Sequence, residues 1–369
     1  MIRDGAHQAR TEEEKEAVYR FRYEIYVAEM GRYQNVADHK RRRFREPEDD
    51  SARIFYVAKG GEVLATSRFN WGGDAPFTER LIDHYDLARF LAEIPAEAMA
   101  IGERGMVKPE LRGTPIFTEL GQKSYEFIGK NRVELIFGAC EPHLLSRYVS
   151  QGSRTFAAKN INSPESGYLI PIVNVTEDVE YLRRIGSPTA GMTRDWGADT
   201  RIPDGLESLL GNERNVLSQR LVDSGLYLSE VNDSLHDLTH DQVSVLEGLT
   251  NDEVSGVLIK SNIINCKAGD HVIKKGGTAH NMFVLLEGHV EVYEGDSMVA
   301  VFGPGDIFGA MAFLLECERV TDMWAATDCR ILSLSESTIR ASIDSDAHGA
   351  AHLMLNIAKM LCVRILKSR

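Results

Sequence analysis

The sequence predicts an α+β protein built from two domains, and three observations support this fold class. The chain has 369 residues, which exceeds the length of an ordinary single domain. Its first half alternates helix-like and strand-like apolar patterns, which predicts a mixed β-sheet flanked by helices. Its second half carries short apolar runs between glycine turns, with helical patterns on either side. We expect an N-terminal domain over residues 1–185, a linker and helical segment over 186–230, and a C-terminal domain over 231–369.

The elements expected in the first half are a helix, a hairpin, and then alternating strands and helices. Residues 11–33 are expected to form an amphipathic helix, because Thr11 and Glu14 have the spacing of a capping box. A hairpin is expected at 53–58 and 63–69, across a turn with two adjacent glycines. The further expected elements are a strand near 99–108, a helix at 114–130, a strand at 133–139, a helix at 142–151, and strands near 153–158 and 167–175.

The second half is expected to begin and end with helices. Residues 186–205 have the Gly- and Pro-rich composition of a linker, and residues 206–260 have a mostly helical pattern. The last expected helix, near 347–366, has an apolar face made of Leu353, Ile357, Met360, Leu361 and Ile365. Neither an internal repeat nor a low-complexity tract is present in the sequence.

Composition limits the classes of function. The net charge of −13 disfavours a nucleic-acid partner, because such proteins usually carry a basic surface. No apolar run approaches the roughly 18 residues of a membrane span, and the N-terminus lacks the apolar core of a signal peptide. Five cysteines without paired spacing suit a reducing compartment, so we expect a cytoplasmic protein. A basic run at 40–45 precedes acidic residues at 46–50, and we expect the two to neutralise each other within one loop.

The most informative motif lies between residues 276 and 325. Residues 303–306 (Gly-Pro-Gly-Asp) form a turn by composition, Gly309 begins a short apolar segment, and Arg319 follows. A glycine-led turn that runs into a helix start presents backbone N–H groups to an anion. An arginine beside it can bind two phosphate oxygens. The pattern therefore predicts a phosphate-binding site.

With these features, residues 245–369 resemble the cyclic-nucleotide-binding domain, a small β jelly roll with a phosphate cassette. The family cassette reads Phe-Gly-Glu-(apolar)-Ala, and this chain has Ala310 in place of the glutamate that accepts the ribose 2′-hydroxyl. Two alternatives stay open: weak or altered cyclic-nucleotide binding, and a degenerate roll that only packs or forms a homodimer. The site residues that the resemblance implies are Gly309, Ala310, Met311, Ala312, Arg319, Val320 and Thr321.

The segment from Met106 to Leu120 carries a second motif, in which a proline, an arginine and a glycine separate a strand from a helix. Together with the order of elements, it makes residues 10–180 resemble the GNAT superfamily of acyl-thioester-dependent N-acyltransferases. Pro115 and Phe117 stand where the family usually has glycine, so we expect a weak grip on the coenzyme A pyrophosphate. A donor held by its pantetheine arm, as on acyl carrier protein, would tolerate this better. The implied donor-binding residues are Met106, Val107, Arg112, Gly113, Thr114 and Ile116.

The stretch 19–33, followed by an acidic pair, resembles the front end of the acyl-homoserine lactone synthases and the N-acyl amino acid synthases. These are GNAT-fold enzymes that take long acyl chains from acyl carrier protein. The resemblance implies a polar site for a small amine acceptor, and a structural ion-pair network is the alternative for the same residues. The implied acceptor-binding residues are Arg22, Asp49, Asp50, Arg68 and Arg104.

Acyl transfer to an amine needs a neutral amine, an oxyanion donor and a proton for the leaving thiolate. The resemblance implies a backbone N–H near Met106 and Val107 as the oxyanion donor, and Tyr148 as the acid that protonates the thiolate. The alternative for Tyr148 is a helix residue with a solvated hydroxyl. Glu103 is a candidate base, although a solvated charge at a strand end is the favoured interpretation of this residue.

Metal chemistry is not expected. Two histidine pairs, His236 with His240 and His348 with His352, have helical spacing, but neither has the glutamate of a HExxH motif or a clear third ligand. We expect them to be surface histidines of helices. No Walker loop and no dinucleotide-binding GxGxxG motif is present, which disfavours a kinase, an NTPase or a dehydrogenase.

The expected activity is an N-acyl transfer without a permanently bound cofactor. The donor would be an acyl thioester on acyl carrier protein or coenzyme A, including long acyl chains, and the acceptor the amine of a small molecule such as an amino acid. The C-terminal domain would regulate the transfer or dimerise. The alternatives are a non-enzymatic sensor with an inactive acyl site, and a nucleotide-regulated protein lysine acetyltransferase.

Overall fold

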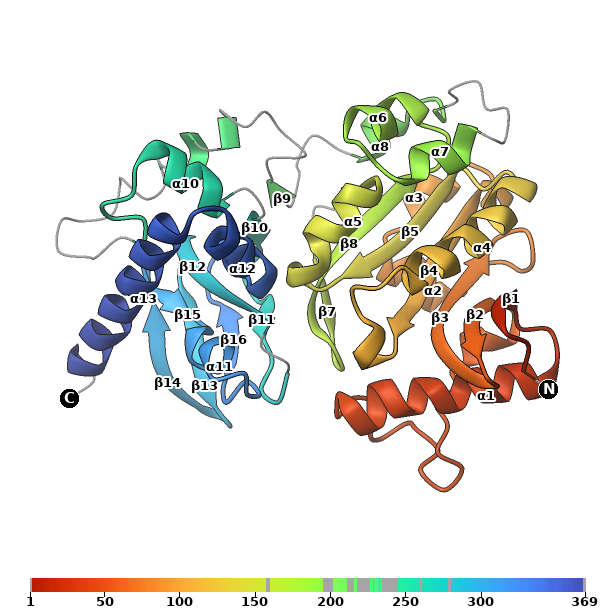
Figure 1. Ribbon diagram of the computed structural model, residues 1–369, viewed down its shortest axis with the longest axis horizontal. Helices are drawn as coiled ribbons and strands as arrows, with labels where there is room; N and C mark the ends of the chain where they lie inside the picture. Colours follow the sequence, from red (N-terminus) through yellow and green to blue (C-terminus); the bar gives the residue numbers. More distant parts are fainter. Residues whose placement is uncertain are drawn as a thin grey trace. The chain divides into compact units, whose positions relative to one another are not determined.

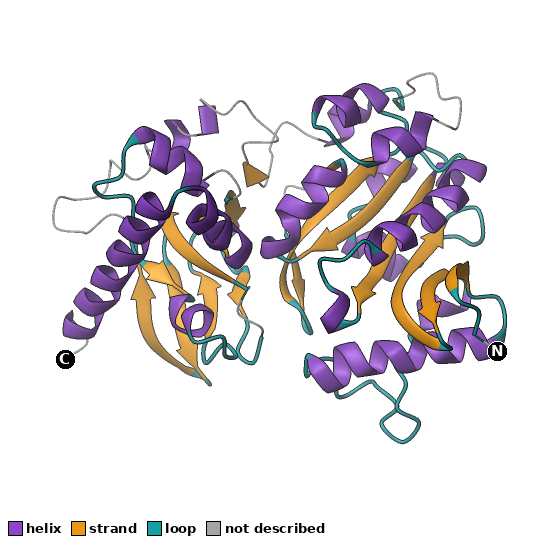
Figure 2. Ribbon diagram, viewed as in Figure 1, coloured by secondary structure: helices purple, strands orange, loops and turns teal. Residues whose placement is uncertain are grey.

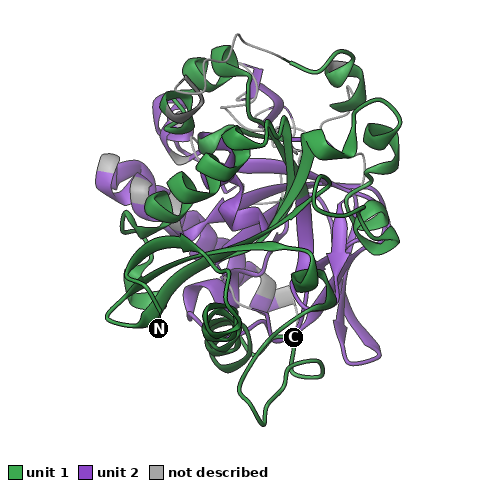
Figure 3. Cartoon of the chain, turned by 90° about the vertical axis from the view of Figure 1, so that its right-hand side faces the viewer, with its two compact units in different colours: residues 1–139, 151–154, 171–211 green, residues 140–150, 155–170, 212–369 purple. Residues whose placement is uncertain are grey.

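A computed structural model gives the structure over residues 2–156, 160–194, 202–210, 216–217, 226–227, 229–231, 233, 245–258, 261–277 and 280–367. The chain divides into two compact units, which Figure 3 distinguishes by colour. Unit 1 comprises residues 1–139, 151–154 and 171–211, and unit 2 comprises residues 140–150, 155–170 and 212–369. Two short stretches of the first half therefore group with the C-terminal part of the chain.

The first half of the chain forms one mixed β-sheet with helices around it, as predicted (Figure 1, Figure 2). Its first four strands pair antiparallel, whereas β4 and β5 pair in parallel. A parallel pair needs a crossover connection, and helix α4 supplies it. The strand order is β1 (Gly5–Gln8), β2 (Arg53–Lys59), β3 (Glu62–Trp71), β4 (Met99–Val107), β5 (Leu135–Cys140), β8 (Gly167–Val175) and β6 (Ser153–Thr155), and β7 (Ile161–Ser163) pairs with β8.

Local sequence accounts for the first helix and the first hairpin. The Thr11 hydroxyl accepts a bond from the Glu14 amide, and the Glu14 carboxylate accepts one from the Thr11 amide, which is the predicted capping box. The hairpin between β2 and β3 turns at Gly60 and Gly61, which have φ angles of 62° and 81°. Two adjacent left-handed residues give a turn whose twist matches that of the strands.

Strand β4 is irregular in its second half. Arg104 has a φ angle of 55°, and the register against β3 shifts between the Arg68–Glu103 pair and the Thr66–Met106 pair. This is a β-bulge, and bulges redirect side chains near functional sites. The described register with β5 runs from Met99 to Ile101, in the part of β4 before the bulge.

Most helices before residue 211 belong to unit 1, and those within residues 140–150 belong to unit 2. A π-helical turn, η1, extends α1, so the expected helix over 11–33 ends at residue 29. Residues 189–194, expected as part of a linker, form helix α7, and the hydroxyl of Thr189 bonds to the carbonyl of Gln151. The helices are α1 (Glu12–Arg22), η1 (Tyr23–Glu29), η2 (Pro47–Asp50), α2 (Glu79–His84), α3 (Ala88–Leu91), η3 (Ala96–Ala98), η4 (Pro109–Leu111), α4 (Ile116–Lys130), η5 (Pro142–Leu144), α5 (Leu145–Gln151), α6 (Val179–Arg184), α7 (Thr189–Arg194) and α8 (Leu206–Leu210).

The C-terminal part is a jelly-roll-like fold of two antiparallel sheets, as expected (Figure 1). The first sheet has the order β15 (Ile307–Phe308), β12 (Asn281–Glu287), β17 (Cys329–Ser335), β10 (Asn262–Cys266) and β9 (Val216–Leu217). The second has the order β11 (His271–Ile273), β16 (Asp322–Ala325), β13 (Val290–Glu294) and β14 (Ser297–Phe302). The helices are α10 (Asn251–Leu258), α11 (Ala310–Leu314), α12 (Glu336–Ser345) and α13 (Ala347–Lys367).

One apolar core joins the roll to its last helix. Leu353 and Ile357 of α13 are buried against Met282, Val284 and Leu332 of the first sheet. The predicted apolar face of the last helix is therefore confirmed as far as Met360 and Leu361, which pack against this core, whereas Ile365 is exposed. Much of the helical pattern expected over 206–260 lies outside the described residues.

The stretch 155–170, which belongs to unit 2, contacts the roll directly. The side-chain amide of Asn160 donates to the carbonyl of Asn265 at 2.8 Å, and the amide of His271 donates to Oδ1 of Asn162 at 3.1 Å. The domain boundaries expected at 185 and 230 stay a prediction.

Candidate functional site

Arg319 lies in the predicted anion site, and its guanidinium is buried, with 6% of the residue exposed. Nη1 donates to the carbonyl oxygen of Gly309 at 2.5 Å. Nη2 donates to the carbonyl oxygen of Asn281 at 2.5 Å and to its Oδ1 at 3.1 Å. These acceptors are uncharged, and they hold the guanidinium beside the start of helix α11.

Within the described ranges, Arg319 forms no ion pair with a carboxylate. Burial lowers the pKa of its guanidinium to about 10, against a smaller opposing effect of Cys317. A buried charge without a counter-charge is costly, because burial removes its hydration. The site is therefore suited to bind an anion.

The cassette residues around Gly309 define what else the site offers. Gly309 precedes α11 with a φ angle of 73°, and a Cβ there would lie 2.7 Å from Nη1 of Arg319. Ala310 is buried and belongs to the apolar core of unit 2. Its methyl group cannot accept a hydrogen bond, so this position offers no carboxylate to a ribose hydroxyl.

The other implied residues of this site differ in exposure. Ala312 is buried, Thr321 is half-buried, and both Met311 and Val320 are exposed. Ala310 and Ala312 therefore help to form the core, whereas the side chains of Met311 and Val320 are exposed at the surface.

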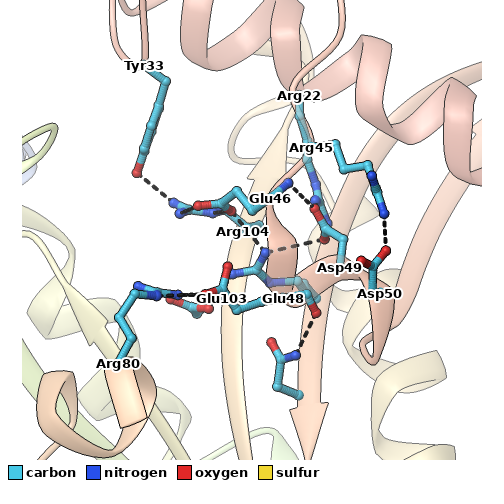
Figure 4. A network of polar contacts seen from close by, with 12 residues as sticks. Arg22, Tyr33, Arg45, Glu46, Glu48, Asp49, Asp50, Arg80, Glu103 and Arg104 are labelled. Carbon is cyan, nitrogen blue, oxygen red and sulfur yellow. Dashed lines mark hydrogen bonds and ion pairs between the residues drawn. The ribbon is translucent and has the colours of Figure 1, made fainter. Parts of the chain in front are cut away.

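A second cluster of charged side chains lies in unit 1, on strands β3 and β4 and the loop that ends in η2 (Figure 4). Arg68 is its centre and is fully buried. Its Nη1 donates to Glu46 at 2.9 Å and to Asp49 at 3.3 Å, and its Nη2 donates to Glu103 at 2.5 Å. These carboxylates keep the pKa of Arg68 above its usual value, although burial opposes them.

Arg104, displaced by the β4 bulge, forms the second part of this cluster. Its Nε and Nη2 donate to the two oxygens of Glu46 at 2.6 and 2.5 Å, and Nη1 donates to the hydroxyl of Tyr33 at 2.7 Å. A forked contact of this kind fixes both position and orientation of the guanidinium. Figure 4 shows the hydroxyl of Tyr33 directed at the guanidinium of Arg104.

Arg22 and Asp49 form the third part and are both fully buried. Nη1 of Arg22 donates to Oδ1 of Asp49 at 2.7 Å, and the amide of Glu46 donates to the other oxygen of Asp49 at 2.8 Å. Burial raises the pKa of Asp49, but Arg22 and Arg68 outweigh it, so the pKa lies below its usual value. In the described part of the chain, Nε and Nη2 of Arg22 have no hydrogen-bond partner.

Glu103 lies in the middle of β4 with only 11% of its side chain exposed, so its interpretation as a solvated strand-end charge is wrong. Besides the contact with Arg68, its Oε1 accepts from the hydroxyl of Tyr85 at 2.9 Å. Burial opposes ionisation, yet Arg68 and Arg104 lower the pKa of Glu103 to about 2. A carboxylate with so low a pKa is a poor base at neutral pH.

The acidic stretch 46–50 does not mainly neutralise the basic run before it, contrary to expectation. Glu46 and Asp49 bind the buried arginines, and Glu48 binds Arg80 at 2.6 Å. Of these acidic residues, Asp50 is the one that forms an ion pair with the basic run, with Arg45. Asp50 is exposed, and its described ion pair is with Arg45 and not with the four other implied acceptor-binding residues.

The implied donor-binding segment follows the end of β4. Met106 and Val107 are buried in β4, and Arg112 binds Glu29 at 2.7 Å. Gly113 has a φ angle of 84°, the hydroxyl of Thr114 bonds to the carbonyl of Leu111, and Ile116 begins α4. Pro115 caps α4 without a side-chain bond.

Tyr148 lies in α5 of unit 2 and is half-buried, whereas Glu103 lies in β4 of unit 1. The catalytic role of Tyr148 stays a prediction.

The histidine pairs were expected to be surface residues. His348 is exposed and contacts Glu253 at 2.6 Å, and His236 and His240 lie outside the described residues. Where the chain is described, no group of three potential ligands is placed to hold a metal.

Sequence reasoning missed five residues of the contacts in and around the unit 1 cluster: Tyr33, Glu46, Glu48, Arg80 and Tyr85. The available signal for Glu46 was its place in the acidic stretch beside Asp49. Tyr85 and Arg80 lie in the segment between β3 and β4. The sequence pattern of this segment does not indicate that these two side chains bind carboxylates. Only the fold brings these residues to the cluster.

Comparison with known proteins identifies the C-terminal part. Residues 263–346 match the model of the family described as the cyclic nucleotide-binding domain. A cAMP-dependent protein kinase regulatory subunit from Colletotrichum orbiculare is 30% identical over 101 residues, 27% of this chain and 26% of that protein. The human cGMP-dependent protein kinase 2 is 29% identical over 76 residues, 21% of this chain and 10% of that protein.

Glutaminase 2 from Bradyrhizobium diazoefficiens is 30% identical over 139 residues, 37% of this chain and 22% of that protein. The chain thus spans about a quarter or less of the length of these curated relatives. Among solved structures, a cyclic nucleotide-binding domain from Methylobacillus flagellatus aligns over 42% of this chain and 85% of its own, with 15% identity and a TM-score of 0.35. No helix within the described residues has the length and apolar character needed to cross a bilayer. Residues 263–346 are therefore similar in sequence to the cyclic nucleotide-binding domain.

Proposed function

We propose that this protein is a regulatory sensor whose C-terminal domain binds a cyclic nucleotide through its phosphate. The observation that carries the proposal is Arg319, a buried guanidinium that only uncharged oxygens contact among the described residues. A cyclic phosphate would supply the missing negative charge. Relatives that match this domain include kinases whose names state dependence on cAMP or cGMP.

The affinity should be low, because the site lacks a partner for the ribose. Ala310 occupies the place of the glutamate that the family resemblance predicts, and losing a charged hydrogen bond weakens binding roughly ten- to a hundred-fold. Starting from an ordinary micromolar site, this gives a dissociation constant near or above ~100 μM. Regulation would then require a high ligand concentration or a ligand with different contacts.

Calorimetric titration of the full chain with cyclic AMP and cyclic GMP tests this proposal. The variant Arg319→Gln should abolish binding, because the neutral amide cannot compensate the phosphate charge. Arg340→Gln is the matched control, since Arg340 is an exposed arginine of the same unit that pairs with Glu336. Equal affinity in wild type and Arg319→Gln would disprove a role for this arginine, and no heat at millimolar ligand would disprove nucleotide sensing.

N-acyl transfer by the first half of the chain is the second candidate function. The antiparallel β2–β3–β4 sheet, the bulge in β4 and the parallel pairing of β4 with β5 across helix α4 support it, because this is the order of elements on which the resemblance rests. The cluster around Arg68 could bind an acceptor, but its ion pairs serve equally as a structural network. We propose an acyl thioester as donor and a small amine as acceptor.

Steady-state assays with long-chain acyl carrier protein, acetyl-CoA and a panel of amino acids test this second function. We expect the carrier-protein donor to be preferred, because Pro115 removes an N–H donor and Phe117 adds bulk at the start of α4. Efficient turnover of acetyl-CoA alone would favour a lysine acetyltransferase. The absence of turnover with every donor would leave the sensor as the function of the whole chain.

If Tyr148 protonates the leaving thiolate, Tyr148→Phe should lower kcat about 100-fold, which is the scale of general acid catalysis. Tyr293→Phe is the matched control. Tyr293 lies in strand β13 of the roll, and the described contact of its hydroxyl is with Glu291. An unchanged kcat in Tyr148→Phe would mean that this tyrosine only packs in α5.

A further inference from the structure

The loop between η1 and η2 carries the basic run of the sequence, and Arg104 holds both of its ends. Nη1 of Arg104 donates to the hydroxyl of Tyr33 at 2.7 Å, and Nε donates to Glu46 at 2.6 Å. The rings of Tyr33 and Phe44 lie 4.5 Å apart and close the base of the loop. Between these anchors the loop projects away from helix α1 (Figure 1). Its base is therefore fixed by the same cluster that forms the candidate acceptor site.

Hydrogen bonds also order the interior of this loop. The backbones of Asp38 and Arg43 exchange two hydrogen bonds, at 3.0 and 3.1 Å, and the Asp38 carboxylate accepts one from the Arg41 amide at 3.0 Å. Nδ1 of His39 lies 2.9 Å from the hydroxyl of Tyr23 in η1. A surface that is ordered before a partner arrives loses less conformational entropy when it binds.

The end of the loop is a positive surface, the basic tip, formed by Lys40, Arg41 and Arg42. All three side chains are exposed. Among the ion pairs of the described residues, the tip takes part in one, between Arg41 and Asp38, with a long separation of 4.0 Å. The acidic stretch 46–50 mainly binds arginines elsewhere and leaves the tip uncompensated. On a chain with a net charge of −13, such a local positive surface favours a negatively charged partner.

The number of charges favours an acidic protein over a membrane or a nucleic acid. Anionic membranes are bound by clusters of about four to eight basic residues, or by helices with an apolar face. The tip has three basic residues, and Val36 is the exposed large apolar residue of this fully described loop. Proteins that bind DNA through its backbone commonly contact about six to ten phosphates, which is also more than the tip can neutralise. A protein surface with a few carboxylates matches the tip in both charge and size.

We propose that the basic tip is the docking surface for an acidic partner protein, the carrier protein that bears the acyl donor. The inference rests on the second candidate function and names the surface that holds its donor. Pro115 and Phe117 weaken the expected grip on a coenzyme A pyrophosphate, so the affinity for a donor must come from another surface. The tip supplies it through charge, because opposite charges speed association and orient the partner. Since Arg104 holds both ends of the loop, the docked carrier rests on an element that is joined to the candidate acceptor site.

The test measures, by fluorescence anisotropy, binding of the full chain to the holo form of an acyl carrier protein with an acidic surface. We expect a dissociation constant of about 1–50 μM at about 50 mM salt, and at least fivefold weaker binding at about 300 mM, because salt screens exposed charges. The carrier has no acyl chain, and no amine acceptor is present. A chain that docks the carrier without turnover therefore refutes only the acyl transfer, and turnover without docking at the tip refutes only this inference.

Substitutions at the tip locate the binding. The triple variant K40Q/R41Q/R42Q removes the three charges and should weaken carrier binding at least tenfold. The triple variant K40R/R41K/R42K keeps the charges and should retain the wild-type affinity within about twofold, because charges at the rim of an interface act mainly through the rate of association.

The matched control is K59Q/K130Q/R132Q, which removes three exposed positive charges of unit 1 that lie outside the loop. This variant should bind the carrier with wild-type affinity. If K40Q/R41Q/R42Q binds as tightly as the wild type, or if the control loses as much affinity, the proposal is overturned. The same holds if the carrier does not bind at about 200 μM, or if the tip binds anionic lipid vesicles or a short DNA duplex in place of the carrier.

Discussion

Arg319 and Arg68 are both buried arginines, but their surroundings differ in charge. Arg68 contacts three carboxylates, which raise its pKa, whereas Arg319 contacts uncharged oxygens and burial lowers its pKa to about 10. A guanidinium that is already compensated stabilises the fold, and one that is not attracts an anion. Arg319 is therefore suited to bind the phosphate of a ligand. The cluster around Arg68 fits both an acceptor site and a structural ion-pair network.

The cluster makes unit 1 sensitive to acid. The pKa of Glu103 is lowered from 4.5 to about 2, so its ionised form stabilises the folded state above about pH 4.5 and this contribution is lost as the pH falls toward 2. Glu103→Gln should cost about 3–5 kcal/mol at neutral pH, because it leaves Arg68 partly uncompensated, and less in acid. Hydrogen exchange of β3 and β4 amides, measured near pH 7 and near pH 3 and corrected for intrinsic rates, reports the difference.

Glu126→Gln provides the control for this experiment. Glu126 pairs with Lys123 on the exposed side of α4, and such surface pairs contribute less than about 1 kcal/mol. If both variants lower the stability equally, or if the loss in Glu103→Gln stays constant with pH, the buried network does not stabilise unit 1 as described.

At the scale of elements, the sequence predicted most helices and strands because their signals are local. The Thr11 capping box, the glycine pair of the hairpin and the apolar face of α13 all act within a few residues. The β4 bulge could not be predicted, because it depends on the register against β3. The same is true of Glu46 and Tyr85, whose partners lie on strands distant in sequence.

The start of α11 carries a testable steric constraint. A Cβ on Gly309 would lie 2.7 Å from Nη1 of Arg319, and the φ angle of 73° is unfavourable for alanine. Gly309→Ala should therefore cost about 1–2 kcal/mol in stability and weaken nucleotide binding at least tenfold, since the guanidinium must move. Thermal unfolding and calorimetry measure the two effects.

Gly295→Ala separates the steric effect from the backbone effect. Gly295 also has a left-handed φ angle, of 61°, but a Cβ at this position would have no neighbouring atom within 4 Å. This variant should lose stability without losing nucleotide affinity. Unchanged affinity in Gly309→Ala would show that Arg319 does not need its observed position.

At the scale of the molecule, the main feature is that unit 2 contains residues 140–150, which precede the roll by more than a hundred positions. The ring of His143 lies 4.6 Å from that of His280, and Nδ2 of Asn262 contacts the Ser146 hydroxyl at 3.4 Å. His280 directly precedes Asn281, which holds Arg319. A contiguous path therefore joins the anion site to the segment that carries the candidate acid Tyr148.

This path predicts that a ligand at Arg319 changes the dynamics of η5 and α5. A phosphate that draws the guanidinium away from Asn281 should alter hydrogen exchange over residues 142–151, measured with and without saturating cyclic AMP. His143→Ala should keep the nucleotide affinity but remove most of this response, because the ring contact with His280 is lost. His289→Ala, in the turn between β12 and β13, is the control and should preserve it. If the ligand changes hydrogen exchange equally in wild type and His143→Ala, the coupling follows another path. If the wild type binds nucleotide without any change over residues 142–151, the sensor domain does not act through this segment.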